Sequence, residues 1–292
     1  MGRLLERLRS GEILVCDGAM GTQLQDRGLG IGECPDSWNL THPDVVTSIH
    51  RAYLDEGCDL IITNTFGANG LRLGRFGKEV EVYKINLAGA RIAKEAAKES
   101  GMVLGDIGPT GEFVAPAGSL KAEDLYGVFK EQVLALVEGG VDAIIVETMS
   151  DLVEAKSAVR AAKENSSLPV IASMTFQKGR YGYRTMMGLD PQEATKGLEA
   201  ASCDVIGSNC GAGICEMIDI IREIRPLTDI PLIAEPNAGL PKLVKGKTVF
   251  DETPQDFVRN LPDLISAGAN IIGGCCGTTP QHIAEIVKLV RR

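Results

Sequence analysis

The sequence predicts a single (β/α)8 TIM barrel, an α/β fold. Three observations predict it: eight short apolar segments alternate with eight amphipathic ones, the chain has 292 residues, and the long loops lie on one side of that alternation. Barrels of this class usually need ~250 residues. No linker-like stretch divides the chain, so residues 1–292 are expected to form one domain. A doubly wound open sheet is the alternative with the same alternation.

The expected strands are short and nearly continuous in apolarity, with polar residues at the C-terminal ends of most of them. Such runs are typical of strands that are buried on both faces of a parallel sheet. They are Ile13–Asp17, Asp59–Phe66, Met102–Ile107, Ala143–Thr148, Pro169–Phe176, Val205–Cys210, Pro231–Glu235 and Asn270–Gly274.

Helical periodicity marks the segments between these strands. The expected helices run approximately over Pro43–Glu56, Glu79–Glu99, Ala122–Glu138, Asp151–Asn165, Pro191–Ala201, Ile214–Ile224, Pro254–Ala267 and Pro280–Arg291. Asp151 is placed to cap one helix, and Thr253 and Thr279 each precede a proline at a helix start. Glycines stand where helices should end, at Gly57, Gly101, Gly139 and Gly268.

The connections that follow the strands are long, whereas those that follow the helices are short. The long ones are Gly18–His42, Gly67–Lys78, Gly108–Lys121, Gln177–Asp190 and Asn237–Thr253. In a barrel they gather at the C-terminal face, where barrel enzymes place their active sites. The ends of the strands are therefore where functional residues are expected.

Composition excludes several classes of function. The net charge is −9 and no stripe of Lys and Arg is present, which argues against a nucleic-acid partner. No apolar run approaches the ~20 residues that span a bilayer, so no membrane role is expected. The first ten residues are too charged for the apolar core of a secretory signal, so a cytoplasmic protein is expected.

Three of the eight cysteines fall at strand ends. Cys210 ends the sixth strand, and Cys275 and Cys276 follow the eighth. Three thiolates that meet at one point suit tetrahedral zinc, which leaves a fourth position for water or substrate. The alternative is a buried or redox-active pair, Cys275–Cys276, with Cys210 unrelated to it. The other cysteines in strand or helix patterns are expected to be core residues; they are Cys16, Cys58 and Cys203.

The charge of such a site indicates its chemistry. Zinc with three thiolates carries a net charge of −1 and is a poor Lewis acid, but it can hold a fourth thiol as its thiolate. This favours attack of a bound substrate thiolate on an electrophilic carbon, which is S-alkylation. Hydrolysis is less favoured because no histidine stands near a strand end to act as a base; the three histidines, His42, His50 and His282, fall in helical patterns or at their starts.

Seven segments together resemble the homocysteine S-methyltransferase family. Within that family, the chain is most similar to the homocysteine-binding module of cobalamin-dependent methionine synthases. The resemblance covers essentially the whole chain, in order. It is carried by Asp17–Thr22, Thr63–Gly67, Gly105–Gly111, Glu147-Thr148, Ser208–Cys210, Glu235–Gly239 and Gly273–Pro280.

This resemblance implies the ligands and the substrate. Zinc would be held by Cys210, Cys275 and Cys276, and the sulfur of homocysteine would be the fourth ligand. Asn237 would occupy that position before the substrate arrives. Glu147, helped by Asp17, would bind the substrate ammonium. The substrate carboxylate would be received around Gly18, Ser173 and Asn209.

The methyl donor is not specified by these motifs. Aromatic residues are only 4% of the chain, which is few for a cage around an onium cation, so methylcobalamin on a separate corrinoid protein is favoured. S-methylmethionine, S-adenosylmethionine and betaine are the alternative donors. A hypothesis of another class is a zinc or redox thiol sensor, in which Cys275 and Cys276 cycle between thiols and a disulfide.

Overall fold

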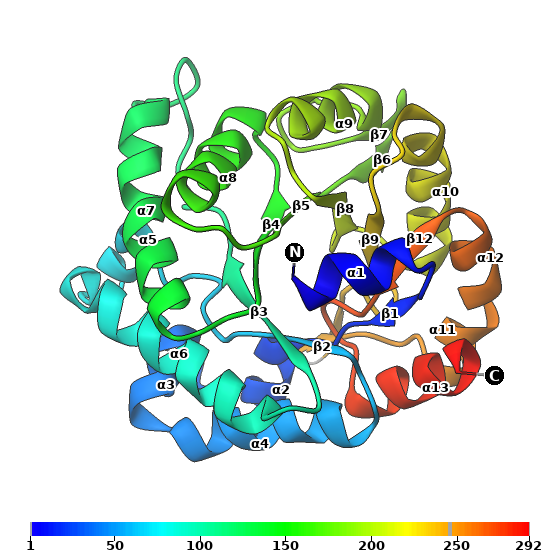
Figure 1. The fold of residues 1–292 in the computed structure, drawn as a ribbon, viewed down its shortest axis with the longest axis horizontal. Coiled ribbons are helices and arrows are strands. Elements are labelled where there is room, and N and C mark those ends of the chain that lie inside the picture. Colours follow the sequence, from blue (N-terminus) through cyan, green and yellow to red (C-terminus); the bar gives the residue numbers. More distant parts are fainter. Residues whose placement is uncertain (1, 245–246, 292) are drawn as a thin grey trace.

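The computed structural model describes residues 2–244 and 247–291, and its centre is a barrel of eight parallel strands (Figure 1). Around the barrel the order is β1-β12-β9-β8-β5-β4-β3-β2. A parallel bridge between Cys16 and Leu60 joins the two ends of this order. An open sheet would leave those edges unpaired, so the (β/α)8 prediction is confirmed. The strands are β1 Leu14–Val15, β2 Leu60–Ile62, β3 Met102–Ile107, β4 Ala143–Met149, β5 Val170–Met174, β8 Val205–Asn209, β9 Leu232–Glu235 and β12 Ala269–Ile272.

Helices surround the barrel at the places that the periodicity predicts (Figure 1). They are α4 Pro43–Asp55, α6 Val82–Ala97, α7 Ala122–Glu138, α8 Leu152–Asn165, α9 Pro191–Ala200, α10 Ile214–Ile224, α11 Pro254–Arg259, α12 Leu261–Ser266 and α13 Pro280–Val290. The cap at Asp151 is confirmed, because its carboxylate accepts from the backbone N–H groups of Val153 and Glu154.

One expected helix is wrong. The segment Pro254–Ala267 is divided into α11 and α12 at Asn260. Pro262 explains the break, since it has no N–H for the carbonyl of Val258 and its ring would clash with that carbonyl in a continuous helix.

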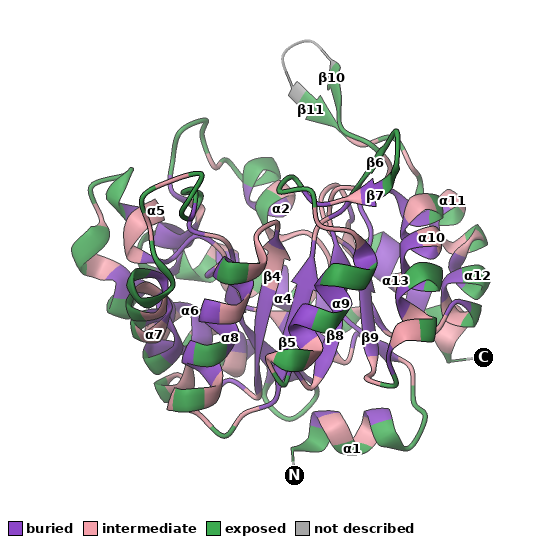
Figure 2. Cartoon of the chain, turned by 90° about the horizontal axis from the view of Figure 1, so that it is seen from above, coloured by how far each residue is buried: buried purple, intermediate pink, exposed green. Residues whose placement is uncertain are grey.

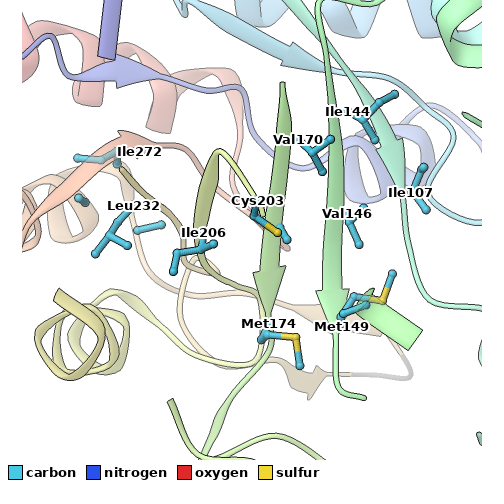
Figure 3. Packing of buried hydrophobic residues seen from close by; sticks show 14 of the residues in the cluster. Ile107, Ile144, Val146, Met149, Val170, Met174, Cys203, Ile206, Leu232 and Ile272 are labelled. Carbon is cyan, nitrogen blue, oxygen red and sulfur yellow. The ribbon is translucent and has the colours of Figure 1, made fainter. Parts of the chain in front are cut away.

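Two layers of apolar side chains form the core. One layer lies inside the barrel and takes one residue or more from each of the eight strands, including Leu104 and Ile145. The other lies between the strands and the helices, where Figure 3 shows Ile144 and Val146. Because successive residues of a strand point to opposite faces, Ile144, Ile145 and Val146 alternate between these layers. Cys16 packs in the inner layer, and Cys58 and Cys203 pack in the outer one, as expected.

Elements that the sequence pattern did not predict lie at the two ends of the barrel (Figure 2). Helix α1 (Arg3–Arg9) covers the N-terminal end and adds Leu4 and Leu8 to the inner layer. At the opposite end, the long loops contain α2 Met20–Asp26, α3 Trp38–Thr41, α5 Gly70–Gly74 and the hairpins β6–β7 (Gln177–Gly179, Gly182–Arg184) and β10–β11 (Lys242–Val244, Lys247–Val249). The C-terminal end is thus the end left for a site. In the described part of the chain, no helix is both long enough and apolar enough to cross a membrane.

Candidate metal centre and active-site pocket

The sulfur atoms of Cys210, Cys275 and Cys276 meet at the C-terminal end of the barrel. All three Sγ atoms lie within 4.8 Å of one another. The distances from the Sγ of Cys276 to those of Cys210 and Cys275 are both 4.0 Å. A zinc ion with sulfur ligands at ~2.3 Å in a tetrahedron would separate those sulfurs by about 3.8 Å, so the trio fits zinc. A disulfide needs an S–S distance of about 2.05 Å, so the cysteines are separate thiols in this arrangement.

Local backbone geometry aims the three sulfurs at one point. Cys210 follows β8 with φ = 57°, a left-handed conformation that costs a non-glycine residue about 1–3 kcal/mol. Cys275 and Cys276 lie beyond the end of β12, in a turn that continues through Gly277 at φ = 82°. A Cβ atom at Gly277 would clash with the ring of Phe250, so only glycine fits there. The turn is held to the loop after β9, because the N–H of Cys275 donates to the carbonyl of Pro236 at 2.9 Å.

The thiols of the trio share their protons unequally. Hydrogen bonds from Cys275 and Cys276 lower the pKa of Cys210, and the same contacts raise the pKa of Cys275. The neighbouring Cys210 also raises the pKa of Cys276, to about 12. Protein groups alone therefore favour one thiolate among the three. Three thiolates at these distances require a cation, which a divalent metal ion would supply.

Asn237 lies beside this trio. Its side chain hydrogen-bonds to Cys210. Its Oδ1 is buried and has no hydrogen-bond partner among the described residues. A buried amide oxygen without a partner is costly, and a metal ligand bond would satisfy it. Asn237 therefore fits the position that the sequence analysis gives it, as an oxygen ligand before substrate binds.

A pocket of about 430 Å³ opens at the cysteines. Its volume lies within the range of small-molecule sites. All three cysteines border it, and so do the residues Gly18–Thr22 of the first loop. Phe66, Phe76 and Arg72 border it as well.

The floor of the pocket is acidic. Asp106, Glu147 and Glu235, which come from β3, β4 and β9, all border it. Among the described residues, Oδ1 of Asp106 and both carboxylate oxygens of Glu235 have no hydrogen-bond partner. Burial, and then the nearby Glu147, raise the pKa of both groups, and burial followed by Cys210 raises the pKa of Glu147 to about 8. Such a cluster disfavours its own charge and favours a positively charged ligand.

Sequence reasoning placed polar groups at these strand ends but did not select Asp106 and Glu235 as site residues. Like Glu147, both residues are carboxylates near the end of a buried strand, and this shared position could have identified them. Asp17, which was selected, does not border the pocket. Its Oδ2 accepts from the N–H of Ile62 at 3.0 Å, and burial raises its pKa to about 8. Asp17 still acts on the pocket through Glu147, because its proximity contributes to the raised pKa of that residue.

Ser173 and Asn209 are fully buried and do not border the pocket either. Oγ of Ser173 donates to Oδ1 of Asn209 at 2.6 Å. Nδ2 of Asn209 donates to Oε2 of Glu147 at 2.8 Å. Ser173 thus contacts Asn209, and Asn209 contacts Glu147, whereas the expected binding of the substrate carboxylate around these residues stays a prediction.

One protein family matches almost the whole chain. A family model described as homocysteine S-methyltransferase matches residues 14–290. The chain belongs to the homocysteine S-methyltransferase family. The matched range includes the three cysteines and the three acidic residues of the pocket floor, so the site lies within the part of the chain that the family model matches.

Two mycobacterial methionine synthases are relatives of this chain. The proteins from Mycobacterium leprae and Mycobacterium tuberculosis are each 34% identical to the chain, over 99% and 96% of its length. The chain spans only 25% of the length of these relatives.

Solved structures show the same fold. The homocysteine methyltransferase MmuM from Escherichia coli, in its metallated form, superposes with a TM-score of 0.80 at 22% identity. The match covers 98% of this chain and 99% of that one. The oxidized form of MmuM superposes with a TM-score of 0.77 at 23% identity.

Proposed function

We propose that this chain is a zinc-dependent thiol S-methyltransferase that methylates homocysteine to methionine. The observation that carries the proposal is the meeting of three cysteine sulfurs beside a pocket with an acidic floor. Cys210, Cys275 and Cys276 would hold the zinc. When bound, zinc would keep the substrate thiol in its thiolate form near neutral pH, where a free thiol of pKa ~8.5 is mostly protonated.

The pocket residues would orient an amino-acid substrate. Glu147 would receive the ammonium group, and this positive charge would lower the raised pKa values of Asp17, Asp106 and Glu235, so that their carboxylate forms would add to the attraction. Asn237 would offer its buried Oδ1 as an oxygen ligand in the absence of substrate. Methyl transfer would form the bond between this sulfur and the methyl carbon while the bond from that carbon to the donor breaks, and the electron pair of the broken bond would leave with the donor.

We favour methylcobalamin, carried by a separate corrinoid protein, as the methyl donor. An onium donor is usually held against aromatic faces. Of the two phenylalanines at the pocket, Phe66 already has the guanidinium of Arg72 over its ring, 5.1 Å from the centroid, and Phe76 is partly exposed to solvent. This arrangement offers little of a cage to S-methylmethionine, S-adenosylmethionine or betaine.

A donor panel tests the proposed function. Zinc-loaded protein, kept reduced, is assayed for methionine formation from homocysteine with methylcobalamin, S-methylmethionine, S-adenosylmethionine or betaine. We expect methionine with methylcobalamin and none above background with the others. Turnover with one of the onium donors alone would overturn the choice of donor. Absence of methionine with every donor, together with reversible oxidation of Cys275 and Cys276 to a disulfide, would favour the sensor hypothesis.

A further inference from the structure

We propose that Asn209 is a positioning residue that aims Glu147 at the ammonium group of the substrate; this inference rests on the proposed function. The side chain of Asn209 links three neighbouring strands. Asn209 ends β8, Ser173 is in β5, and Glu147 and Thr148 are in β4. Its amide contacts all three of these partners.

The amide of Asn209 has no capacity left for a ligand. Nδ2 carries two N–H groups, and it donates to Oε2 of Glu147 at 2.8 Å and to Oγ1 of Thr148 at 2.7 Å. It also lies 4.0 Å from Sγ of Cys275, a longer contact to the cysteine trio. Oδ1 has two lone pairs, and it accepts from the backbone N–H of Thr148 at 2.8 Å and from Oγ of Ser173 at 2.6 Å. An asparagine side chain can make four such bonds, and all four are made within the protein. Asn209 therefore acts on the substrate through Glu147 and does not bind it directly.

The hydrogen bonds of Asn209 also hold Thr148 in an unfavourable backbone conformation. It has φ = 60°, in the left-handed region that β-branched residues avoid. Asn209 accepts from its N–H and donates to its hydroxyl oxygen, so the strained residue is held at both polar groups. Thr148 lies within an irregularity in the register of β4, between Val146 and Met149, and comes directly after Glu147, which borders the pocket. The position of that carboxylate is thus tied to Asn209 through a direct hydrogen bond and through the backbone.

Ser173 makes this reach possible. Strand β5 lies between β8 and β4, so the side chain of Asn209 must cross β5 to contact Glu147. A small, fully buried residue stands at the crossing, and its hydroxyl group supplies one of the four bonds. A larger side chain at position 173 would keep Asn209 from reaching Glu147. Alanine would leave the space open but would remove the hydrogen bond from Oγ of Ser173 to Oδ1 of Asn209.

The test compares two thiols that differ only in the ammonium group. Homocysteine and 4-mercaptobutyrate, which lacks the amine, are titrated into zinc-loaded wild type and Asn209→Ala by calorimetry. Because a hydrogen bond to a charged group is worth about 1.5–3 kcal/mol, we expect homocysteine to bind about 10–100-fold more weakly to the variant. Because Nδ2 of Asn209 also lies 4.0 Å from Sγ of Cys275, both proteins are first loaded to one zinc ion per chain. We then expect 4-mercaptobutyrate to bind both proteins with the same affinity.

Further variants separate positioning from a structural role. Glu147→Gln should show the same selective loss, and adding Asn209→Ala to it should weaken homocysteine binding little further, since both act at one contact. Ser173→Ala, a milder change, should give a smaller loss that is again selective for homocysteine, and this variant decides the question if Asn209→Ala does not fold. Equal weakening of both thiols, or additive losses in the double variant, would overturn the positioning role. A wild-type protein that binds neither thiol would overturn the proposed function as well.

Discussion

Replacing Cys276 by serine is expected to remove the zinc from the protein and to abolish methyl transfer to homocysteine. Its Sγ lies 4.0 Å from each of the other two sulfurs of the trio, close to the separation of about 3.8 Å expected for two sulfur ligands of one zinc ion. Losing a residue that only supports a metal ligand typically costs 10–100-fold in affinity or activity, and a ligand itself should cost at least about 100-fold. Metal analysis of the purified, reduced variant and its turnover with methylcobalamin measure the two effects.

Cys215→Ser is the matched control for this variant. Cys215 is an exposed thiol in α10 and is not a member of the trio, so its replacement should leave both zinc content and turnover unchanged. Comparable losses in the two variants would contradict a metal centre at Cys276. A Cys276→Ser protein that keeps its zinc and its turnover would contradict it directly.

Replacing Glu147 by glutamine is expected to weaken the use of homocysteine strongly. The substitution keeps the size of the side chain and removes its negative charge, which is the part that attracts an ammonium group. Loss of a charged hydrogen bond of about 1.5–3 kcal/mol corresponds to about 10–100-fold in kcat/KM. We expect most of this change in KM, because the ammonium group stays bound throughout the reaction and takes no part in bond breaking.

Glu154→Gln provides the comparison for a buried glutamate outside the pocket. Glu154 is buried in α8, where its Oε1 accepts from the N–H and the hydroxyl group of Thr110. Glutamine can keep these bonds, so steady-state kinetics with homocysteine should match the wild type. If Glu147→Gln also had the wild-type KM, the ammonium group would have to bind elsewhere.

The barrel could be predicted from the sequence because each of its strands carries its own signal. Runs such as Met102–Ile107 are apolar except near their C-terminal ends, and local caps such as Asp151 mark where the helices begin. The interruption at Asn260 could have been found too, since Pro262 stands inside the expected helix. The hairpins β6–β7 and β10–β11 have strands of only three residues, which is too short for a periodic pattern to show.

The site could be predicted only in part. Cys210, Cys275 and Cys276 were found because residues at the ends of barrel strands share one face. The role of Asn209 could not be found in this way, because it depends on which side chains meet across β8, β5 and β4 and on how many bonds each makes. For the same reason, Asp17 was selected for the pocket although its carboxylate turns to the backbone of Ile62.

The central claim is that three cysteine sulfurs hold a zinc ion that binds the thiol of the substrate. X-ray absorption at the zinc edge, on reduced protein loaded with zinc, tests it most directly. The account predicts three sulfur ligands at about 2.3 Å and one lighter ligand in the free protein, and four sulfur ligands after homocysteine is added. Fewer than three sulfur ligands in the free protein, or a sulfur count that homocysteine leaves unchanged, would contradict it.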